Sequence, residues 1–448
     1  MTIAGVRAAL DLETAASEML AWMADLYPIC RSITGDGVRE TLSLVKQQIP
    51  LTVHEVPSGT PVFDWTVPKE WNVRDAWVET ADGERVIDFR TSNLHVLNGS
   101  VPVHARMSLE ALRPHLFTLP EHPDWVPYRT SYYAERWGFC LSHNRLQRLR
   151  EGEYEVCIDA TLENGHLTYG ECYVQGETSD EVLLSAHVCH PSLANDNLSG
   201  IALLTFLARA LAGLRPRYSY RFLFIPGTIG AITWLALNEA HVGRIKHGLV
   251  VACVGDAGRS TYKKSRRGDA EIDRVVAHVL RHAGAAYEIV DFSPYGYDER
   301  QFCSPGFDLP VGCFMRTPHG RFPEYHTSAD DLDLVQPAAL ADSLDKALAV
   351  IEVLEGNGTY VNLNPRCEPQ LGRRGLYRML GGPADAGLDE LALLWTLSLS
   401  DGRHCLLDVA ERSGQPFAAV RCAADVLEHH GLLTDAHVQP HPAGGIRP

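Results

Sequence analysis

Apolar and polar residues recur along this chain in a pattern that predicts alternating strands and helices from about residue 135 to 358. Short apolar runs with the length of buried strands are separated by longer stretches with apolar positions every three or four residues. The predicted strands are 181–187, 219–226, 248–254, 286–292 and 310–315. The predicted helices are 198–213, 228–240, 269–284 and 337–355. This order is typical of the α/β class, with a mixed or parallel sheet flanked by helices.

The chain on either side of this region follows other patterns. Residues 10–48 carry apolar positions at helical spacing. Residues 51–130 are rich in Pro and Trp and contain short runs in which apolar and polar residues alternate, which predicts a small β insertion. We therefore predict a main domain that this insertion splits into residues 1–50 and 131–360.

Three short helical patterns near the C-terminus are joined by turns, at 391–399, 406–412 and 416–429. They predict a winged-helix domain over residues 365–436. Arg421 is the only Lys or Arg of the last helix, and Asp425 and Glu428 lie beside it. Because DNA binding needs cations against the phosphates, we expect this domain to pack or to form a homo-oligomer, with no nucleic-acid partner. Residues 437–448 are predicted to be a disordered tail.

The composition is that of a large globular protein, with 448 residues, 45% hydrophobic and 21% charged. The net charge of −16 argues against a general binder of nucleic acids or of anionic membranes. Residues 1–20 lack the pattern of a signal peptide, and no run approaches the roughly 18 apolar residues of a membrane span. The 11 cysteines include no CxxC pair, so they are expected to be reduced thiols in a cytoplasmic protein with no membrane partner.

Four side chains of the kinds that bind metals stand where predicted strands end. His187 closes one buried apolar run, and Asp196 precedes the helical run that follows it. Asp256 comes just after another apolar run, and His326 lies in a later loop. Because parallel strands end at one edge of a sheet, these side chains are expected to meet there, and such a nitrogen and oxygen set suits zinc. A simpler interpretation makes Asp196 a helix N-cap and Asp256 a turn residue.

Several segments resemble the di-zinc aminopeptidase family, whose fold leucine aminopeptidases and glutaminyl cyclases share. Asn195-Asp-Asn-Leu-Ser-Gly200 resembles the metal-bridging segment of that family, and Tyr325-His-Thr-Ser-Ala-Asp330 is similar to the surroundings of its last zinc histidine. Residues 298–302 and 306–311 resemble its Ser-Asp-His and Gly-Ile-Pro segment. The whole layout also resembles an aminopeptidase-like subgroup with an inserted β domain and a C-terminal winged helix. The expected fold is therefore a zinc-exopeptidase-like mixed sheet.

The resemblance also implies a chemistry and a role for each residue. His187 would bind one zinc ion, Asp196 would bridge two, Asp256 would complete the first set and His326 would bind the second. One or two zinc ions would then serve a hydrolase that cleaves an amide or peptide bond next to a free amino group. The implied substrate is a peptide or an aminoacyl small molecule.

Two departures from the family pattern change this picture. Cys189 stands where the family has an Asp that orients the first zinc histidine. Gly227 and Thr228 stand where the family has a pair of Glu, one a general base and one a zinc ligand. The second metal would keep only Asp196 and His326. The alternatives are therefore a repurposed single-metal amidase or deacylase in a small-molecule biosynthetic pathway, or an inactive binding protein on the same fold.

Other residues offer replacements for what is missing. Glu299 and Glu324 are the candidates for the catalytic base or for holding a substrate ammonium group. His190 could reach the metal that His187 binds, or it could satisfy backbone groups. The cationic loop 262–268 could grip a substrate carboxylate or phosphate, or it could simply be solvated. The residues predicted to bind substrate are Asp298, Lys264, Arg266 and Tyr325.

Overall fold

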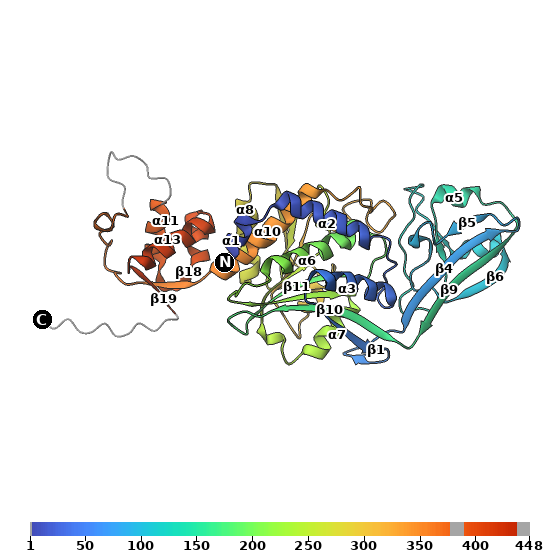
Figure 1. Cartoon of the computed structure of the whole chain (residues 1–448), viewed down its shortest axis with the longest axis horizontal. Helices are drawn as coiled ribbons and strands as arrows, with labels where there is room; N and C mark the ends of the chain where they lie inside the picture. The colour runs from blue at the N-terminus through green and yellow to red at the C-terminus, as the bar shows by residue number, and fades with distance from the viewer. Residues whose placement is uncertain (1, 377–388, 437–448) are drawn as a thin grey trace. The chain divides into compact units, whose positions relative to one another are not determined.

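The computed structural model describes residues 2–376 and 389–436 and forms two compact units (Figure 1). These units are Met1–Asp273 with Ala285–Leu348, and Arg274–Gly284 with Ala349–Pro448. The predicted tail, 437–448, lies outside the described residues. Among the described residues, no helix combines the length and the apolarity that crossing a membrane requires.

The larger unit is built around a mixed sheet of eight strands. In spatial order they are β1 (Thr52–Pro57), β10 (His166–Val174), β12 (Ser219–Ile225), β11 (Glu181–His187), β13 (Ile245–Val251), β16 (Val311–Met315), β14 (Ser260–Lys263) and β15 (Tyr287–Val290). β12, β11, β13 and β16 pair in parallel, whereas β1, β10 and β12 pair antiparallel with one another. This sheet confirms the predicted α/β fold, and each predicted strand occurs within a few residues of its expected place.

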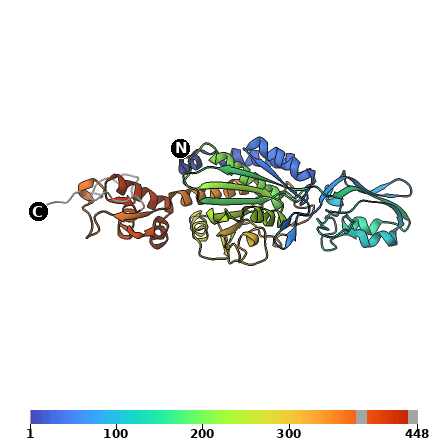
Figure 2. The ribbon, with the colours of Figure 1, turned by 90° about the horizontal axis from the view of Figure 1, so that it is seen from below.

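Helices cover both faces of the sheet. α2 (Leu12–Leu26), α3 (Asp36–Gln48) and α6 (Ser199–Leu211) lie on one face, and α7 (Ile229–Asn238) lies on the other (Figures 1 and 2). α2 begins where the side chain of Asp11 accepts a hydrogen bond from the backbone N of Thr14. Its buried residues recur at helical spacing, at Ala15, Ala16, Met19, Trp22, Met23 and Leu26. α6 packs between α2 and β11, so it is buried on almost all sides and nearly free of charge.

A second sheet of four strands belongs to the same unit. In spatial order its strands are β5 (Arg85–Asp88), β4 (Glu70–Thr80), β9 (Glu153–Glu163) and β6 (Val103–Ser108). β9 lies beyond the predicted insertion of 51–130, and β1, inside that range, belongs to the large sheet. The predicted and observed bounds of the β insertion differ because composition marks only the Pro- and Trp-rich loops. Composition does not reveal that β4 pairs with β9, which lies far along the chain.

Smaller elements complete the larger unit. They are α1 (Ile3–Ala9), β2 (Pro61–Val62), β3 (Trp65–Thr66), α4 (Leu109–Leu112), β7 (Leu116–Phe117), β8 (Phe139–Cys140), α5 (His143–Arg148) and α9 (Glu299–Phe302). Two longer helices, α8 (Glu271–His282) and α10 (Pro337–Gly356), contribute residues to both units.

The C-terminal part of the smaller unit is a winged helix, as the turn pattern predicted. Its described elements are β17 (Thr359–Asn362), α11 (Glu390–Leu399), β18 (Asp401–Cys405), α12 (Leu406–Ser413), α13 (Phe417–His429) and β19 (Leu433–Asp435), with β17 between β18 and β19 in the sheet. On α13, Arg421 forms an ion pair with Asp425 and donates a hydrogen bond to Oη of Tyr360 at 2.7 Å. The cation of this helix is therefore already engaged within the unit.

Candidate metal site

The carboxyl edge of the large sheet carries two of the predicted metal ligands. β11 is buried along its whole length and ends at His187. The chain then passes through the buried segment Ala194–Leu198, which carries Asp196 and leads into α6. Nε2 of His187 lies 2.9 Å from Oδ1 of Asp196. The burial of the apolar strand and helix thus brings two polar side chains together at the strand end.

Two further histidines approach the same carboxylate. Nε2 of His326 lies 3.0 Å from Oδ2 of Asp196, and Nδ1 of His190 lies 4.0 Å from that oxygen. Nδ1 of His190 is buried and has no hydrogen-bond partner among the residues that the structure describes. The ligand atoms of His187, His190 and Asp196 all lie within 4.8 Å of one another. These four residues, His187, His190, Asp196 and His326, are called the Asp196 cluster below.

The protonation states of Asp196 and His190 suit a divalent metal ion. Burial alone would raise the pKa of Asp196, but the imidazoles of His190, His187 and His326 hold that pKa well below its usual range. Burial lowers the pKa of His190 well below its usual value, so this ring is neutral at pH 7. An ionised carboxylate and neutral imidazoles are the forms that coordinate metals, and this donor set favours zinc. The residues present therefore fit the zinc ion that the family resemblance implies.

Neighbouring side chains hold the backbone of the cluster in place. Oδ1 of Asp330 accepts a hydrogen bond from N of Asn195 at 2.6 Å, and its Oδ2 accepts one from N of Asp196 at 3.0 Å. Nε of the buried Arg31 donates to the carbonyl oxygen of His190 at 2.7 Å. Arg31 was not singled out from the sequence, because nothing local distinguishes this arginine from those on the surface.

The ring of His187 is oriented by an amide and by packing. Cys189, at the position of the expected Asp, accepts a hydrogen bond on Sγ from N of Gly227 at 3.2 Å. Nδ2 of Asn197 lies 3.4 Å from Nδ1 of His187, and the ring of Tyr297 stacks on the imidazole with centroids 5.2 Å apart. Asn197 and Tyr297 both lie in or beside the segments that resemble the family, which was the one sequence signal that could have found them.

Asp256 occupies a different place from the one predicted. Its Oδ1 accepts hydrogen bonds from N of Gly258 at 2.7 Å and from Oγ1 of Thr317 at 2.5 Å. Its Oδ2 accepts one from Nδ2 of Asn195 at 3.0 Å. Among the described residues, the group close enough to share an ion contains His187 and does not contain Asp256. In this structure the Asp256 carboxylate therefore lies outside the Asp196 cluster and is engaged in hydrogen bonds with Gly258, Thr317 and Asn195.

A cavity of about 270 Å³ opens beside the Asp196 cluster. Its walls include His187, His190 and Gly227. A Cβ atom at Gly227 would lie 3.6 Å from Cβ of His187 and 3.3 Å from Sγ of Cys189, so position 227 faces the cluster as the resemblance implied. Neither Gly227 nor Thr228 supplies the carboxylate that the family has there.

Asp298 brings a carboxyl group to this cavity from the segment before α9. The residue is 3% exposed, and its Oδ1 accepts a hydrogen bond from N of Thr228 at 2.6 Å. Burial raises the pKa of Asp298 to about 6, although the nearby His187 opposes this change. A carboxyl with this pKa is mostly ionised at pH 7 and takes up a proton more readily than an ordinary aspartate. It lies against the segment in which the expected glutamates are missing.

The structure brings two of the four predicted substrate-binding residues to the cavity. They are Asp298 and Tyr325, whose ring stacks on His326 with centroids 4.0 Å apart. Lys264 and Arg266 lie outside the cavity wall, where their side chains pair with aspartates at 3.0 and 2.7 Å. In this structure these two cations of the loop are engaged in ion pairs rather than facing the cavity.

Neither of the glutamates predicted to be catalytic lines this cavity. Glu299 is fully buried, and its Oε1 accepts a hydrogen bond from Nζ of the buried Lys263 at 2.8 Å. Glu324 is partly exposed, and its backbone carbonyl accepts hydrogen bonds from N and Oγ1 of Thr327. In this structure both residues support the loops around the site.

Glu299→Gln is expected to destabilise the protein by about 3–5 kcal/mol, because it leaves Lys263 charged and buried without its counterion. Urea-induced unfolding followed by tryptophan fluorescence measures the effect. Arg266→Ala is the matched control, since its ion pair is exposed and its loss should change the free energy of unfolding by less than about 1 kcal/mol. Equal stability of the two variants would contradict a structural role for Glu299.

Comparison with known proteins places the fold among the zinc exopeptidases. The family model described as "Domain of unknown function (DUF4910)" matches residues 20–357, and one described as a winged helix-turn-helix matches residues 358–435. A Clostridium acetobutylicum protein, named for polysaccharide biosynthesis and an aminopeptidase-like domain, is 55% identical over 416 residues, which span 93% of this chain and 96% of that protein.

Two solved structures extend the comparison. The crystal structure of a C. acetobutylicum protein, provisionally named a peptidase, has a TM-score of 0.91 at 52% identity and covers 95% of this chain and 97% of its own. A zinc aminopeptidase from Bacillus subtilis has a TM-score of 0.56 at 13% identity, over 75% of this chain and 94% of its own. The second likeness shows a shared fold alone.

Proposed function

This chain belongs to the family described as domain of unknown function DUF4910, and from the site it carries we propose that it is a metal-dependent hydrolase that cleaves an amide or peptide bond next to a free amino group. The observation that carries this proposal is the approach of three imidazoles to the buried Asp196 beside an open cavity. A carboxylate and several histidines around one point form the donor set of a catalytic zinc site, which keeps a position open for substrate.

We propose one resident zinc ion rather than two. His187, His190 and Asp196 would hold it. His326, whose Nε2 lies close to Oδ2 of Asp196, would be the fourth donor. Gly227 and Thr228 offer no carboxylate to a second ion. When bound, the ion supplies Lewis-acid chemistry that polarises the amide carbonyl and activates water at neutral pH.

In this proposal Asp298 moves the proton that hydrolysis requires. Its carboxyl accepts a proton from the attacking water and returns it to the leaving amine, as a general base and then a general acid. The hydrogen bond from N of Thr228 fixes Oδ1, so the second oxygen is the one that can work on substrate. The rings of Tyr297 and Tyr325, which line the same cavity, exclude water around the reacting groups.

The substrate that we propose is an aminoacyl or amide-bearing small molecule of a biosynthetic pathway. The C. acetobutylicum relative is named for polysaccharide biosynthesis, and a single-metal amidase would suit the removal of an acyl or aminoacyl group from an intermediate of that kind. Elemental analysis of the purified protein, together with a panel of aminoacyl amides and N-acyl amino sugars, tests this proposal. About one zinc per chain and turnover of at least one substrate class are expected. Zinc without turnover of either class would favour a binding protein on this fold.

The winged helix is expected not to bind DNA tightly, although the fold itself is common among DNA-binding proteins. On α13, Arg421 is held by Asp425 and Tyr360, so no cation of that helix is left for phosphates. Gel-shift titration of the full chain at low salt should show a Kd no lower than about 1 μM, which is the tight end of the range for non-specific association. Tighter binding that falls steeply with added salt would overturn this expectation. We propose that the domain serves in packing or self-association.

A further inference from the structure

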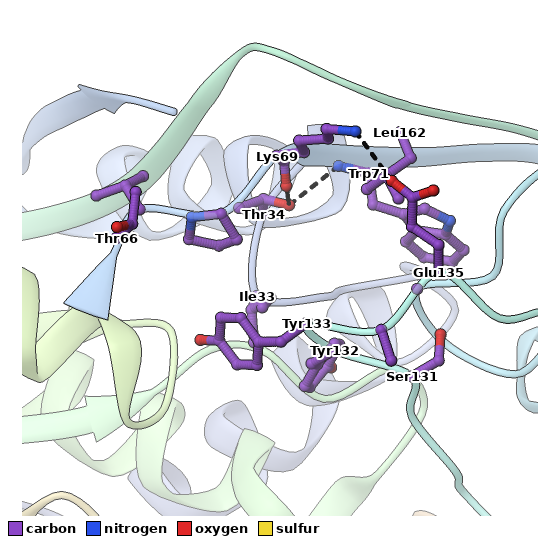
Figure 3. Close-up of a pocket in the computed structure, with 14 residues that line it drawn as sticks. Ile33, Thr34, Thr66, Lys69, Trp71, Ser131, Tyr132, Tyr133, Glu135 and Leu162 are labelled. Carbon is purple, nitrogen blue, oxygen red and sulfur yellow. Dashed lines mark hydrogen bonds and ion pairs between the residues drawn. The ribbon is translucent and has the colours of Figure 1, made fainter. Parts of the chain in front are cut away.

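A second cavity, of about 320 Å³, adjoins the cavity at the Asp196 cluster. Figure 3 shows the residues that line it. The two cavities share three wall residues, Ile33, Tyr132 and Tyr133. We call the second cavity the aromatic pocket, after Trp71, Tyr132 and Tyr133 in its wall. The two cavities therefore adjoin at these three residues.

Tyr133 combines two features that are unfavourable in the absence of a ligand. Its φ of 65° lies in the left-handed region, which bulky side chains rarely adopt. Its side chain is also 57% exposed, and its ring meets that of Trp65 edge to face at 5.3 Å. Strained backbone and exposed aromatic rings both concentrate at binding sites. Phe63 shares both features but lines neither cavity, so it is the place of Tyr133 in the walls of both cavities that points to contact with a ligand.

Several of the polar groups in the wall of the aromatic pocket are paired within the protein. Nε1 of Trp71 donates to a backbone carbonyl at 2.8 Å, and Oη of Tyr132 lies 2.8 Å from Oη of Tyr128. At the mouth, Nζ of Lys69 pairs with Oε1 of Glu135 at 3.0 Å (Figure 3). A polar ligand such as a sugar would give up its hydrogen bonds to water and find few replacements here. An apolar group would gain from leaving water.

The remaining wall and the volume define the size of the ligand group. Ile33, Val67, Pro68 and Leu162 supply apolar surface around the rings. An apolar cavity of about 150 Å³ holds benzene, so a volume of about 320 Å³ accommodates a phenyl or indole ring or a branched aliphatic chain. We propose that the aromatic pocket binds an apolar or aromatic group of the substrate whose amide bond lies at the Asp196 cluster. That the ligand is an amide substrate rests on the proposed function.

Calorimetric titration of the zinc-loaded full chain tests this assignment. The probes are glycyl-glycine, tryptophyl-glycine and glycyl-tryptophan, with glucose as a polar ring that carries no amide. One of the two tryptophan dipeptides should bind about tenfold more tightly than glycyl-glycine, because an indole leaves water. Glucose should bind no more tightly than glycyl-glycine. Equal affinity for all three dipeptides, or a preference for the sugar, would overturn the assignment.

Variants locate the preference in the pocket. Tyr133→Asn removes the ring, and asparagine tolerates left-handed backbone, so the tryptophan advantage should disappear without loss of folding. Phe63→Asn is the matched control, because Phe63 also has a positive φ, of 56°, and is 53% exposed but lies outside the pocket wall. Ala134→Trp, at the mouth, should fill the pocket and remove the advantage as well. An unchanged preference in both pocket variants would contradict the inference.

Chromatography of the same mixtures separates this inference from the proposed function. A tryptophan preference that Tyr133→Asn removes, with none of the probes or the wider amide panel cleaved, would support the pocket and contradict the hydrolase. Cleavage with no preference among the three dipeptides would support the hydrolase and contradict the pocket.

Discussion

Asp196→Asn is expected to remove the bound metal and abolish turnover. The imidazole nitrogens of His187, His326 and His190 lie 2.9, 3.0 and 4.0 Å from the carboxylate oxygens of Asp196. The amide of asparagine has the same shape as this carboxylate but carries no charge. The change should weaken zinc binding by more than about 100-fold, since even partners outside the coordination sphere contribute about 10–100-fold. Elemental analysis after dialysis gives zinc per chain, and an amide substrate found in the panel gives the rate.

Asp256→Asn is the control for this experiment. Both aspartates follow strands of the same sheet edge, but Asp256 is bound by Gly258, Thr317 and Asn195. Zinc content should therefore stay near that of the wild type, with some loss of stability. A loss of zinc in Asp256→Asn together with full zinc in Asp196→Asn would show that the ligand set proposed here is wrong.

Asp298→Asn is expected to lower kcat by about 10²–10⁴-fold, the usual contribution of general acid–base catalysis, while zinc content stays the same. Asn keeps the hydrogen bond from N of Thr228, so the loop should retain its place. Steady-state kinetics separates the two roles that a carboxyl can have in this cavity. A proton-transfer group lowers kcat, whereas a group that only holds a substrate ammonium raises KM.

Glu324→Gln is the matched control for Asp298→Asn. Glu324 is a partly exposed acid close to His326 in sequence, and it lies outside the cavity wall. Its replacement should change kcat by less than about threefold, because no proton-transfer group is removed. A large fall in kcat for Glu324→Gln, with no change in kcat for Asp298→Asn, would show that Glu324 is the general base, as the sequence predicted.

Taken together, these variants distinguish three kinds of protein on this fold. A metal hydrolase loses turnover in both Asp196→Asn and Asp298→Asn but loses zinc in the first alone. A binding protein loses zinc in the first and has no turnover to lose. A chain that binds no zinc in its wild-type form would contradict the hydrolase at its first step.

The sequence by itself determined five strands of the large sheet, the helices between them and the place of two candidate metal ligands along the chain. Strands of about seven apolar residues and helices with apolar positions every three or four are local patterns, so they are visible without the tertiary structure. His187 and Asp196 follow from the same logic, since one ends a buried strand and the other precedes a buried helix. The winged helix was likewise predictable from its spaced turns.

Only the tertiary structure decided which other side chains lie beside His187 and Asp196. Beyond a strand end, the direction of each side chain depends on the path of the loop, and that path depends on contacts with distant segments. The ring of His190 lies near Asp196, and Arg31, far away in sequence, donates a hydrogen bond to the His190 carbonyl. Asp256 lies outside the Asp196 cluster, and its carboxylate accepts hydrogen bonds from Asn195 and Thr317.

The two acids Asp298 and Glu299 show the same division most sharply. They are adjacent in sequence and alike in chemistry, so no local pattern separates their roles. The fold turns Asp298 toward the cavity and against Thr228, and it turns Glu299 toward the buried Lys263. A buried charge must find a counterion or a hydrogen-bond partner, and the available partners come from strands and loops that meet only when the chain is folded.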